Sequence, residues 1–311
     1  MNKHLAQPPP TEDQIITLVQ RELGENVTAL TTLRSGAWSS AVAASTPNSE
    51  YVIRFGATAD DFRCDELAAT FSGPNLPIPG VHAIGQLDDR FWCMSYRMPG
   101  THLNELTTDQ MKLALPSLAA TLTAMRDVDS SSTHGYGGWD AHGNGVFASF
   151  ADQLMDVAED IPDSRGGGWK QILNQHKYER NVFDKGLVIL ERLCTHLPND
   201  RHLVHQDTLN YNVVVHNNII SGIFDWGCAM WGDAVYDLAW FRFWNPWYPQ
   251  WAGLDIPGYL ERKVGINGAQ QHERMRCYLL HIGLMHIRYN AFIGNLVAMN
   301  EVAMSTERLL G

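Results

Sequence analysis

Residues 202–226 read HLVHQDTLNYNVVVHNNIISGIFDW and contain three polar side chains around which the rest of the chain can be organised. Asp207 lies in a polar loop after a short apolar strand, Asn212 starts the next strand five residues later, and Asp225 ends an apolar strand. Phosphoryl transfer needs a carboxylate that orients and deprotonates an attacking hydroxyl, and hard oxygen ligands that hold Mg²⁺ against the phosphates. We therefore predict Asp207 as the catalytic base and Asn212 and Asp225 as the magnesium ligands.

The order of these residues matches the catalytic loop of protein kinases, in which an Asp is followed five residues later by an Asn and then by a metal-binding Asp. The spacing gains meaning from its context, because the loop lies between predicted strands and an antiparallel lobe precedes it. We expect strands at Asn212–Val215 and Ile219–Phe224, joined by a turn at Asn217 and Asn218.

The first 98 residues are predicted to form a strand-rich lobe. Thr11–Gly24 has a capping-box pattern, an apolar stripe and a final glycine, which are typical of an amphipathic helix. A second helix is expected at 59–71. Five antiparallel strands are expected at Val27–Leu33, Ala41–Ser45, Tyr51–Phe55, Val81–Ile84 and Arg90–Tyr96.

After the break at Met98-Pro99-Gly100 the pattern is mostly helical, with long helices near Asp109–Val128 and Tyr178–His196. We expect a loop at Gly135–Gly145. We therefore predict an α+β fold with two lobes: residues 1–98 bind the nucleotide, and residues 99–311 carry catalysis and the acceptor site.

Composition narrows the possible partners. The chain has 311 residues, 45% of them hydrophobic, and a formal net charge of −11. This charge argues against a nucleic-acid partner and is compatible with a cationic substrate. No window approaches eighteen apolar residues and no signal peptide is visible, so we expect a cytoplasmic monomer without membrane contact. The five scattered cysteines are interpreted as buried thiols in a reducing compartment.

The motifs His205–Asn212, Ile223–Trp226 and Gly232-Asp233 resemble the signature of the aminoglycoside phosphotransferases and their choline-kinase-like relatives. Within that family the likeness is nearest to the hygromycin B phosphotransferases. It implies a bilobal protein-kinase-like fold, Mg²⁺ with ATP or GTP, and transfer of the γ-phosphate to a hydroxyl of a polycationic aminoglycoside, which causes antibiotic resistance. Gln206 stands where a glycine is usual, and Tyr211 where the hygromycin enzymes have an amide.

A kinase also needs a cation on the third strand of the nucleotide lobe, paired with an acid from the following helix. Arg54 occupies the strand position, and Glu66 is the expected partner, with Asp65 as the next candidate. Alternatively, each of these acids could simply lie on the solvated face of the helix. Further nucleotide contacts are expected at the turn over the phosphates and at the lobe junction: Ser35, Gly36, Ser39, Tyr96 and Met98.

The resemblance also implies an acceptor site. Four residues are its candidates: Tyr211, Asp233, Trp244 and Trp247. Indole rings pack on sugar faces, although core packing is the alternative for both tryptophans. Asp233 is also expected to brace the catalytic loop, as is His205, while Asp237 is expected to stabilise a helix start. The acids that could pair with substrate ammonium groups are Asp140, Asp233, Asp237 and Glu301.

Two other functions stay open at this point. A metabolic kinase of the same fold could act on another hydroxyl compound, and a kinase-like module could bind ligands without catalysis. The complete set of Asp207, Asn212 and Asp225 argues against the silent module.

Overall fold

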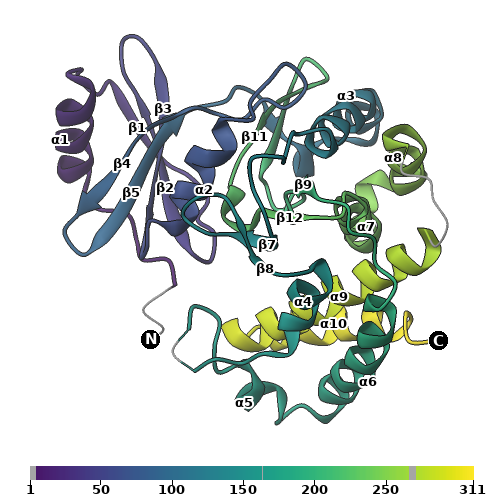
Figure 1. Cartoon of the computed structure of the whole chain (residues 1–311). Helices are drawn as coiled ribbons and strands as arrows, with labels where there is room; N and C mark the ends of the chain where they lie inside the picture. The colour runs from purple at the N-terminus through teal and green to yellow at the C-terminus, as the bar shows by residue number, and fades with distance from the viewer. Residues whose placement is uncertain (1–4, 163, 266–270) are drawn as a thin grey trace. The chain divides into compact units, whose positions relative to one another are not determined.

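The computed structural model describes residues 5–162, 164–265 and 271–311, which form two compact units (Figure 1). The first unit contains the described residues up to Leu103 together with Tyr211–Cys228. The second contains the described residues of Asn104–Asn210 and Ala229–Gly311. The predicted division at residue 98 differs from this one, because the hairpin that carries Asn212 and Asp225 belongs to the first unit.

A five-stranded antiparallel sheet, in the order β1-β2-β3-β5-β4, forms the centre of the first unit. Its strands are β1 (Ala29–Thr32), β2 (Ser39–Ser45), β3 (Glu50–Gly56), β4 (Val81–Leu87) and β5 (Arg90–Tyr96). Helix α2 (Asp60–Ala69) follows β3. The predicted five strands and inserted helix are confirmed, with ends that differ by a few residues.

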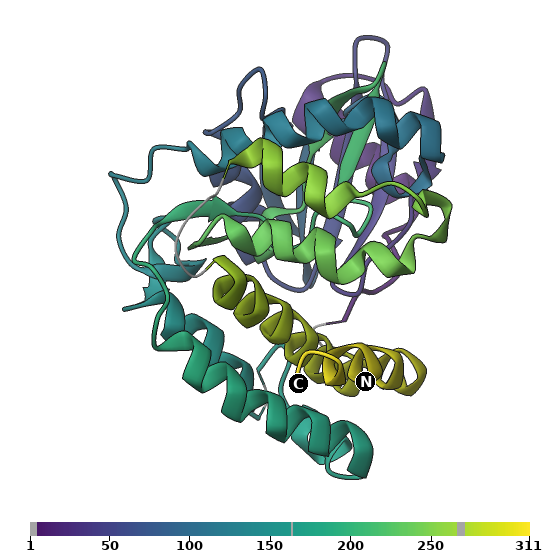
Figure 2. The same cartoon turned by 90° about the vertical axis from the view of Figure 1, so that its right-hand side faces the viewer.

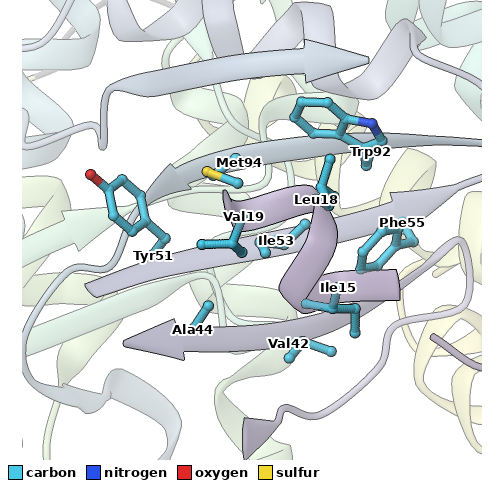
Figure 3. Packing of buried hydrophobic residues seen from close by; sticks show 10 residues of the cluster. All are labelled: Ile15, Leu18, Val19, Val42, Ala44, Tyr51, Ile53, Phe55, Trp92 and Met94. Carbon is cyan, nitrogen blue, oxygen red and sulfur yellow. The ribbon is translucent and has the colours of Figure 1, made fainter. Parts of the chain in front are cut away.

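Helix α1 (Glu12–Leu23) packs its apolar stripe on one face of this sheet (Figure 3). Thr11 and Gln14 form the predicted capping box, and Gly24 ends the helix in the left-handed conformation, with φ 67°. The buried cluster comprises Ile15, Leu18 and Val19 of the helix with Val42, Ala44, Tyr51, Ile53, Phe55, Trp92 and Met94 of the sheet. Burial of each large apolar side chain stabilises the unit by about 1.5–3 kcal/mol, which makes the sheet a firm support for β3.

The hairpin of β10 (Val213–His216) and β11 (Ile219–Ile223) pairs with the short strand β6 (Thr101–His102) in a second sheet. Asn217 and Asn218 have φ values of 51° and 64°, which is the conformation that a tight two-residue hairpin turn requires. Val213 pairs with Ile223, so the residues just beyond this pair, at the open end of the hairpin, are Asn212 and Phe224. The hairpin therefore brings Asn212 close to Asp225.

The second unit is mostly helical. Its helices are α3 (Thr108–Arg126), α4 (Phe150–Met155), α5 (Trp169–Leu173), α6 (Lys177–Cys194), α7 (Val235–Trp244), α8 (Ile256–Val264), α9 (Gln271–Ile293) and α10 (Leu296–Glu307). Figure 2 shows α6, α9 and α10 packed against one another. A small sheet in the order β8-β7-β12-β9 contains β7 (Tyr136–Trp139), β8 (Gly145–Phe147), β9 (His202–Val204) and β12 (Met230–Gly232).

The β7–β8 hairpin corrects the expectation of a loop at Gly135–Gly145. Gly135 has a φ of 71°, and a Cβ atom there would lie 2.1 Å from the carbonyl oxygen of Gly145. Glycine is therefore required for the close approach of the two chains. Strands of four and three residues give too short an alternating pattern to be recognised in the sequence.

The cysteine prediction is only partly right. Cys93, Cys194 and Cys277 are buried, but Cys64 is half-buried and Cys228 is exposed, so the expectation of buried thiols is wrong for Cys228. Among the described residues, no helix combines the length and apolar character needed to cross a membrane.

Candidate active site

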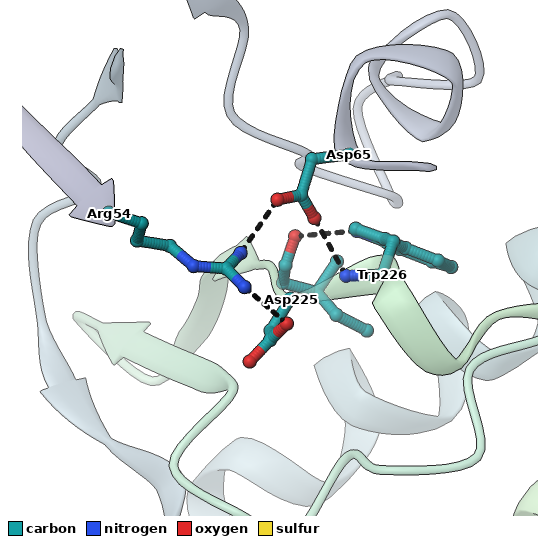
Figure 4. A network of polar contacts seen from close by, with 5 residues as sticks. Arg54, Asp65, Asp225 and Trp226 are labelled. Atoms are coloured by element: carbon teal, nitrogen blue, oxygen red, sulfur yellow. Dashed lines mark hydrogen bonds and ion pairs between the residues drawn. The ribbon is translucent and has the colours of Figure 1, made fainter. Parts of the chain in front are cut away.

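Arg54 on β3 joins two carboxylates of the first unit (Figure 4). Its Nη1 donates to Oδ2 of Asp65 at 2.6 Å, and its Nη2 donates to Oδ1 of Asp225 at 2.7 Å. The other oxygen of Asp65 accepts the backbone N–H of Trp226 at 2.7 Å. The guanidinium thus fixes β3, α2 and the chain after β11 to one another.

The prediction that Glu66 pairs with Arg54 is wrong, and the second candidate, Asp65, takes this role. Successive residues of a helix point about 100° apart, so only one of two neighbours can face β3. Asp65 is on the buried face of α2, whereas Glu66 is exposed. The sequence could not separate them because the apolar pattern of this helix is weak.

The charges of this network depend on one another. Burial by itself would lower the pKa of Arg54. The negative charges of Asp225 and Asp65 outweigh this effect, so the pKa of Arg54 is above its ordinary value. Burial raises the pKa of Asp65 to about 6, against the opposing influence of Arg54. Arg54 is therefore a permanent cation, and a guanidinium is a group that can bind phosphate oxygens.

Asp225 and Asn212 have the chemistry of Mg²⁺ ligands. The Asp225 side chain is 41% exposed, so its carboxylate is open to solvent while one oxygen contacts Arg54. Its φ of 64° is a left-handed conformation that Asp adopts more readily than most residues. Asn212 is buried, and its backbone oxygen accepts the N–H of Phe224 at 3.0 Å. Mg²⁺ is commonly bound by one or two protein oxygens together with phosphates, which this pair fits.

Asp207 lies in the second unit, in the loop that follows β9. Its backbone N–H donates to Nδ1 of His205 at 3.2 Å, and Nδ2 of Asn210 donates to its Oδ2 at 3.2 Å. His205 is fully buried and contacts the loop backbone, as predicted. Gln206 has a φ of 69°, which explains why glycine is usual at this position.

Asp237 on α7 is the residue that holds this loop. Its two carboxylate oxygens accept the backbone N–H groups of His205 at 3.0 Å and of Gln206 at 2.9 Å. Burial raises the pKa of Asp237 to about 6, although both N–H donors oppose the shift. The structure therefore corrects two predictions: Asp237 braces the loop that Asp233 was expected to brace, and its acid is not available to a substrate.

Asp233 is fully buried and belongs to the core of the second unit. Arg274 donates to both of its oxygens, at 2.8 and 2.6 Å, and the hydroxyl of Tyr278 donates to Oδ2 at 2.5 Å. The backbone N–H of Val235 adds a further bond. The prediction of Asp233 as a substrate contact is wrong, because its carboxylate is saturated inside the protein.

The predicted phosphate-covering turn is the connection between β1 and β2. Ser35 and Gly36 are exposed, and the N–H of Gly36 donates to the carbonyl of Ser39 at 3.1 Å. The N–H of Ala6 donates to the carbonyl of Ala37, so the N-terminal segment also contacts the turn. At the end of β5, Tyr96 is exposed and packs on Tyr51, and Met98 contacts Gly222. The nucleotide roles of these residues stay predictions.

Trp244 and Trp247 form an aromatic cluster with His286, a residue that the sequence did not point to. The rings of Trp244 and Trp247 are 4.9 Å apart, and Trp244 lies 4.6 Å from His286. Burial lowers the pKa of His286 to about 4, so its ring is neutral. Among the described residues, the buried indole nitrogens of Trp240 and Trp244 find no hydrogen-bond partner. Trp244 and Trp247 remain predicted acceptor contacts.

Two other acids predicted to meet a substrate have different surroundings. Asp140 accepts the N–H groups of His142 and Asn144 within the β7–β8 turn, and the bond from Asn144 lowers its pKa most. Its carboxylate is therefore committed to the turn. Glu301 is exposed on α10.

Comparison with known proteins gives three findings. Residues 29–276 match the model of the phosphotransferase enzyme family. Hygromycin-B 4-O-kinase of Escherichia coli is 29% identical over 276 residues, which are 87% of this chain and 77% of that protein. A thermostable mutant of aminoglycoside phosphotransferase APH(4)-Ia, solved with AMP-PNP and hygromycin B, has a TM-score of 0.84 at 26% identity and covers 96% of this chain and 98% of its own.

A more distant structure shows the breadth of the fold. Spectinomycin phosphotransferase APH(9)-Ia, in complex with ADP and spectinomycin, has a TM-score of 0.61 at 13% identity, over 97% of this chain and 95% of its own. This likeness concerns the fold alone. Together, the structural matches confirm the predicted bilobal kinase-like fold class.

Proposed function

The chain belongs to the phosphotransferase enzyme family, and on this premise we propose that it transfers the γ-phosphate of ATP to a hydroxyl of an aminoglycoside. One relative is a hygromycin-B kinase by name, and the similar structure of APH(4)-Ia was solved with hygromycin B bound, so hygromycin B is the first acceptor to test. The observation that carries the proposal is the bond between Arg54 and Asp225, because it holds a phosphate-binding cation beside a metal-binding carboxylate. Mg²⁺ as cofactor and GTP as a second donor are parts of the proposal.

In this proposal Asp207 accepts the proton of the acceptor hydroxyl. The hydroxyl oxygen then forms a bond to the γ-phosphorus, the bond from that phosphorus to the bridging oxygen breaks, and the nucleoside diphosphate leaves. Because Asp237 holds the backbone on the N-terminal side of Asp207, it keeps the base oriented without contacting the substrate. Arg54 would neutralise charge on the phosphates, which is where phosphoryl transfer needs electrostatic stabilisation.

Asn212 and Asp225 would hold Mg²⁺. There it would offset the negative charge of the nucleotide phosphates. The turn at Ser35, Gly36 and Ser39 would cover the phosphates, while Tyr96 and Met98 would meet the base. Tyr211, Trp244 and Trp247 are proposed for the acceptor side. A cytoplasmic location and a monomeric state stay predictions.

The deciding experiment measures Mg²⁺-dependent nucleotide turnover by the purified protein against a panel of aminoglycosides that includes hygromycin B and spectinomycin. Mass spectrometry of the acceptor identifies the phosphorylated product. Asp207→Asn and Asp207→Ala are expected to lower kcat at least about a hundredfold, since a general base contributes a factor of this size or more. Asp200→Asn is the matched control, because Asp200 is an exposed acid shortly before the same loop.

The alternatives give different results in this experiment. If no aminoglycoside is phosphorylated but slow hydrolysis of the nucleotide still depends on Asp207, a metabolic kinase with another acceptor is the better description. A chain that binds nucleotide without any turnover would be the silent binding module. Absence of nucleotide binding would contradict the two kinase hypotheses and the nucleotide-binding module alike.

A further inference from the structure

A cation and an aromatic ring connect two parts of the first unit that the proposed function uses separately. The guanidinium carbon of Arg34 lies 4.0 Å from the centroid of the Tyr211 ring. In sequence, Arg34 immediately precedes Ser35 of the phosphate-covering turn, and Tyr211 immediately precedes Asn212 of the metal-binding hairpin. The stack therefore joins the two segments at the residues next to their proposed ligands.

The Tyr211 ring also packs against the ring of His102. It is half-buried, and the ring of His102 meets it edge-on at a centroid distance of 5.6 Å. His102 also packs edge-on against Phe224 at 6.2 Å, and Phe224 is the neighbour of Asp225. Through His102, the ring on which Arg34 lies is thus connected to Phe224, the neighbour of Asp225.

Arg34 itself is exposed. Backbone hydrogen bonds from Leu33 to Ala41 and from Gly36 to Ser39 shape the turn, but they lie within the β1–β2 connection. The contact with Tyr211 is different in kind, because it ties the turn to a residue 177 positions away. A cation over an aromatic face is attracted by the negative charge of the ring face.

We propose that Arg34 is a positioning residue, which stacks on Tyr211 and thereby holds the turn at Ser35 and Gly36 over the nucleotide phosphates. This inference rests on the proposed function, since it assigns the turn to the nucleotide. Tyr211, which is also proposed for the acceptor side, then serves the nucleotide side through the ring face that Arg34 covers. The stack acts on the affinity for the nucleotide, because it fixes a covering segment and supplies no group to the reaction itself.

The test is a double-mutant cycle on the full chain with Arg34→Ala, Tyr211→Asn and the double variant. Asn is chosen for position 211 because Tyr211 has a φ of 63°, which Asn tolerates well and which a β-branched residue would not. For each variant the KM for ATP, the KM for the acceptor and kcat are measured with Mg²⁺ in excess. Thermal unfolding reports whether the fold is intact.

Each single variant is expected to raise the KM for ATP about two- to fivefold, the range of an exposed cation–π contact. The double variant should have the same KM for ATP as a single variant, because either change removes the same interaction. Tyr211→Phe keeps the ring and should keep the coupling to Arg34. Arg21→Ala is the matched control: Arg21 is an exposed residue of α1 in the same unit, with its guanidinium carbon 6.0 Å from the centroid of the Trp92 ring.

Effects of the two single changes that multiply in the double variant would overturn the inference, as would effects confined to kcat or to the KM for the acceptor. Failure of the proposed function looks different. In that case the wild-type protein itself would show no Mg²⁺-dependent turnover or binding of ATP, before any variant is compared.

Discussion

Arg54 and Asp225 form an ion pair of 2.7 Å although 171 positions of the chain separate them. The same guanidinium also donates to Asp65, so each of its two terminal nitrogens is bonded to a carboxylate. A fork of this kind is specific to arginine, because the lysine ammonium offers no fixed pair of donors. The pairing explains how arginine can take the strand position where protein kinases have lysine.

Arg54→Lys is therefore expected to raise the KM for ATP about tenfold, since one of two charge-assisted bonds is lost. Arg54→Ala should in addition destabilise the fold by about 3–5 kcal/mol, because Asp65 is left buried without its counter-charge. Steady-state kinetics and urea unfolding measure the two effects. An Arg54→Lys enzyme with an unchanged KM for ATP would contradict the phosphate role, and Arg21→Lys serves as the exposed control.

Asp65 and Glu66 allow a comparison between neighbours. Asp65→Asn should lower the free energy of unfolding by about 1–3 kcal/mol, because it weakens the bonds to Arg54 and to the N–H of Trp226. Glu66→Gln should stay within about 0.5 kcal/mol of the wild type, as is usual for an exposed substitution. Chemical denaturation measures both. Equal effects of the two changes would mean that Glu66 shares the pairing.

Asp237 offers a test of loop positioning. In Asp237→Asn the side-chain amide can accept only one of the two N–H groups, and its own N–H₂ faces the other donor. We expect kcat to fall about tenfold or more while the KM for ATP stays nearly unchanged. A variant that loses ATP affinity and keeps kcat would show that the loop contributes to binding rather than to the base.

The same variant tests the titration of Asp237. Its folded-state pKa of about 6 is above the ordinary value of 3.8, so the folded protein binds this proton more tightly than the unfolded chain does. The stability that follows is fully present at low pH and is lost as pH rises through about 6. Relative to Asp237→Asn, the wild type should therefore lose up to about 3 kcal/mol between pH 4 and pH 7.

Urea unfolding of both proteins at several pH values across this window checks the sign, because groups common to both cancel in the difference. A wild type that gains stability over Asp237→Asn as pH rises would show that the N–H bonds lower the pKa of Asp237 more than burial raises it.

Asp233 distinguishes a core acid from a substrate contact. Asp233→Asn weakens the charge-assisted bonds with Arg274 and should destabilise the fold by about 3–5 kcal/mol. Where the variant still folds, its KM for the acceptor should equal that of the wild type. Calorimetry and acceptor kinetics on the same sample separate the outcomes, and a raised acceptor KM with an unchanged melting temperature would restore the substrate role.

Local sequence was sufficient for several features. The capping box at Thr11 and Gln14, the hairpin turn at Asn217 and Asn218, and the five-stranded sheet were all predictable. Each rests on neighbouring residues or on an alternating pattern within one segment, so no distant contact is needed to recognise it. The motifs that contain Asp207, Asn212 and Asp225 are also local patterns, and the resemblance that they carry predicted the family.

Tertiary structure decided which acid does which task. Asp65 and Glu66 have almost the same chemistry, and only the direction of α2 relative to β3 selects Asp65 for Arg54. Asp233 and Asp237 lie four positions apart. Asp233 pairs with Arg274, whereas Asp237 binds the loop before Asp207. The sequence by itself determined most of the elements and the family, and it predicts the reacting groups, because these are properties of short patterns. The partners of buried charges were decided only by packing, since the free energy of a buried carboxylate depends on which donors surround it.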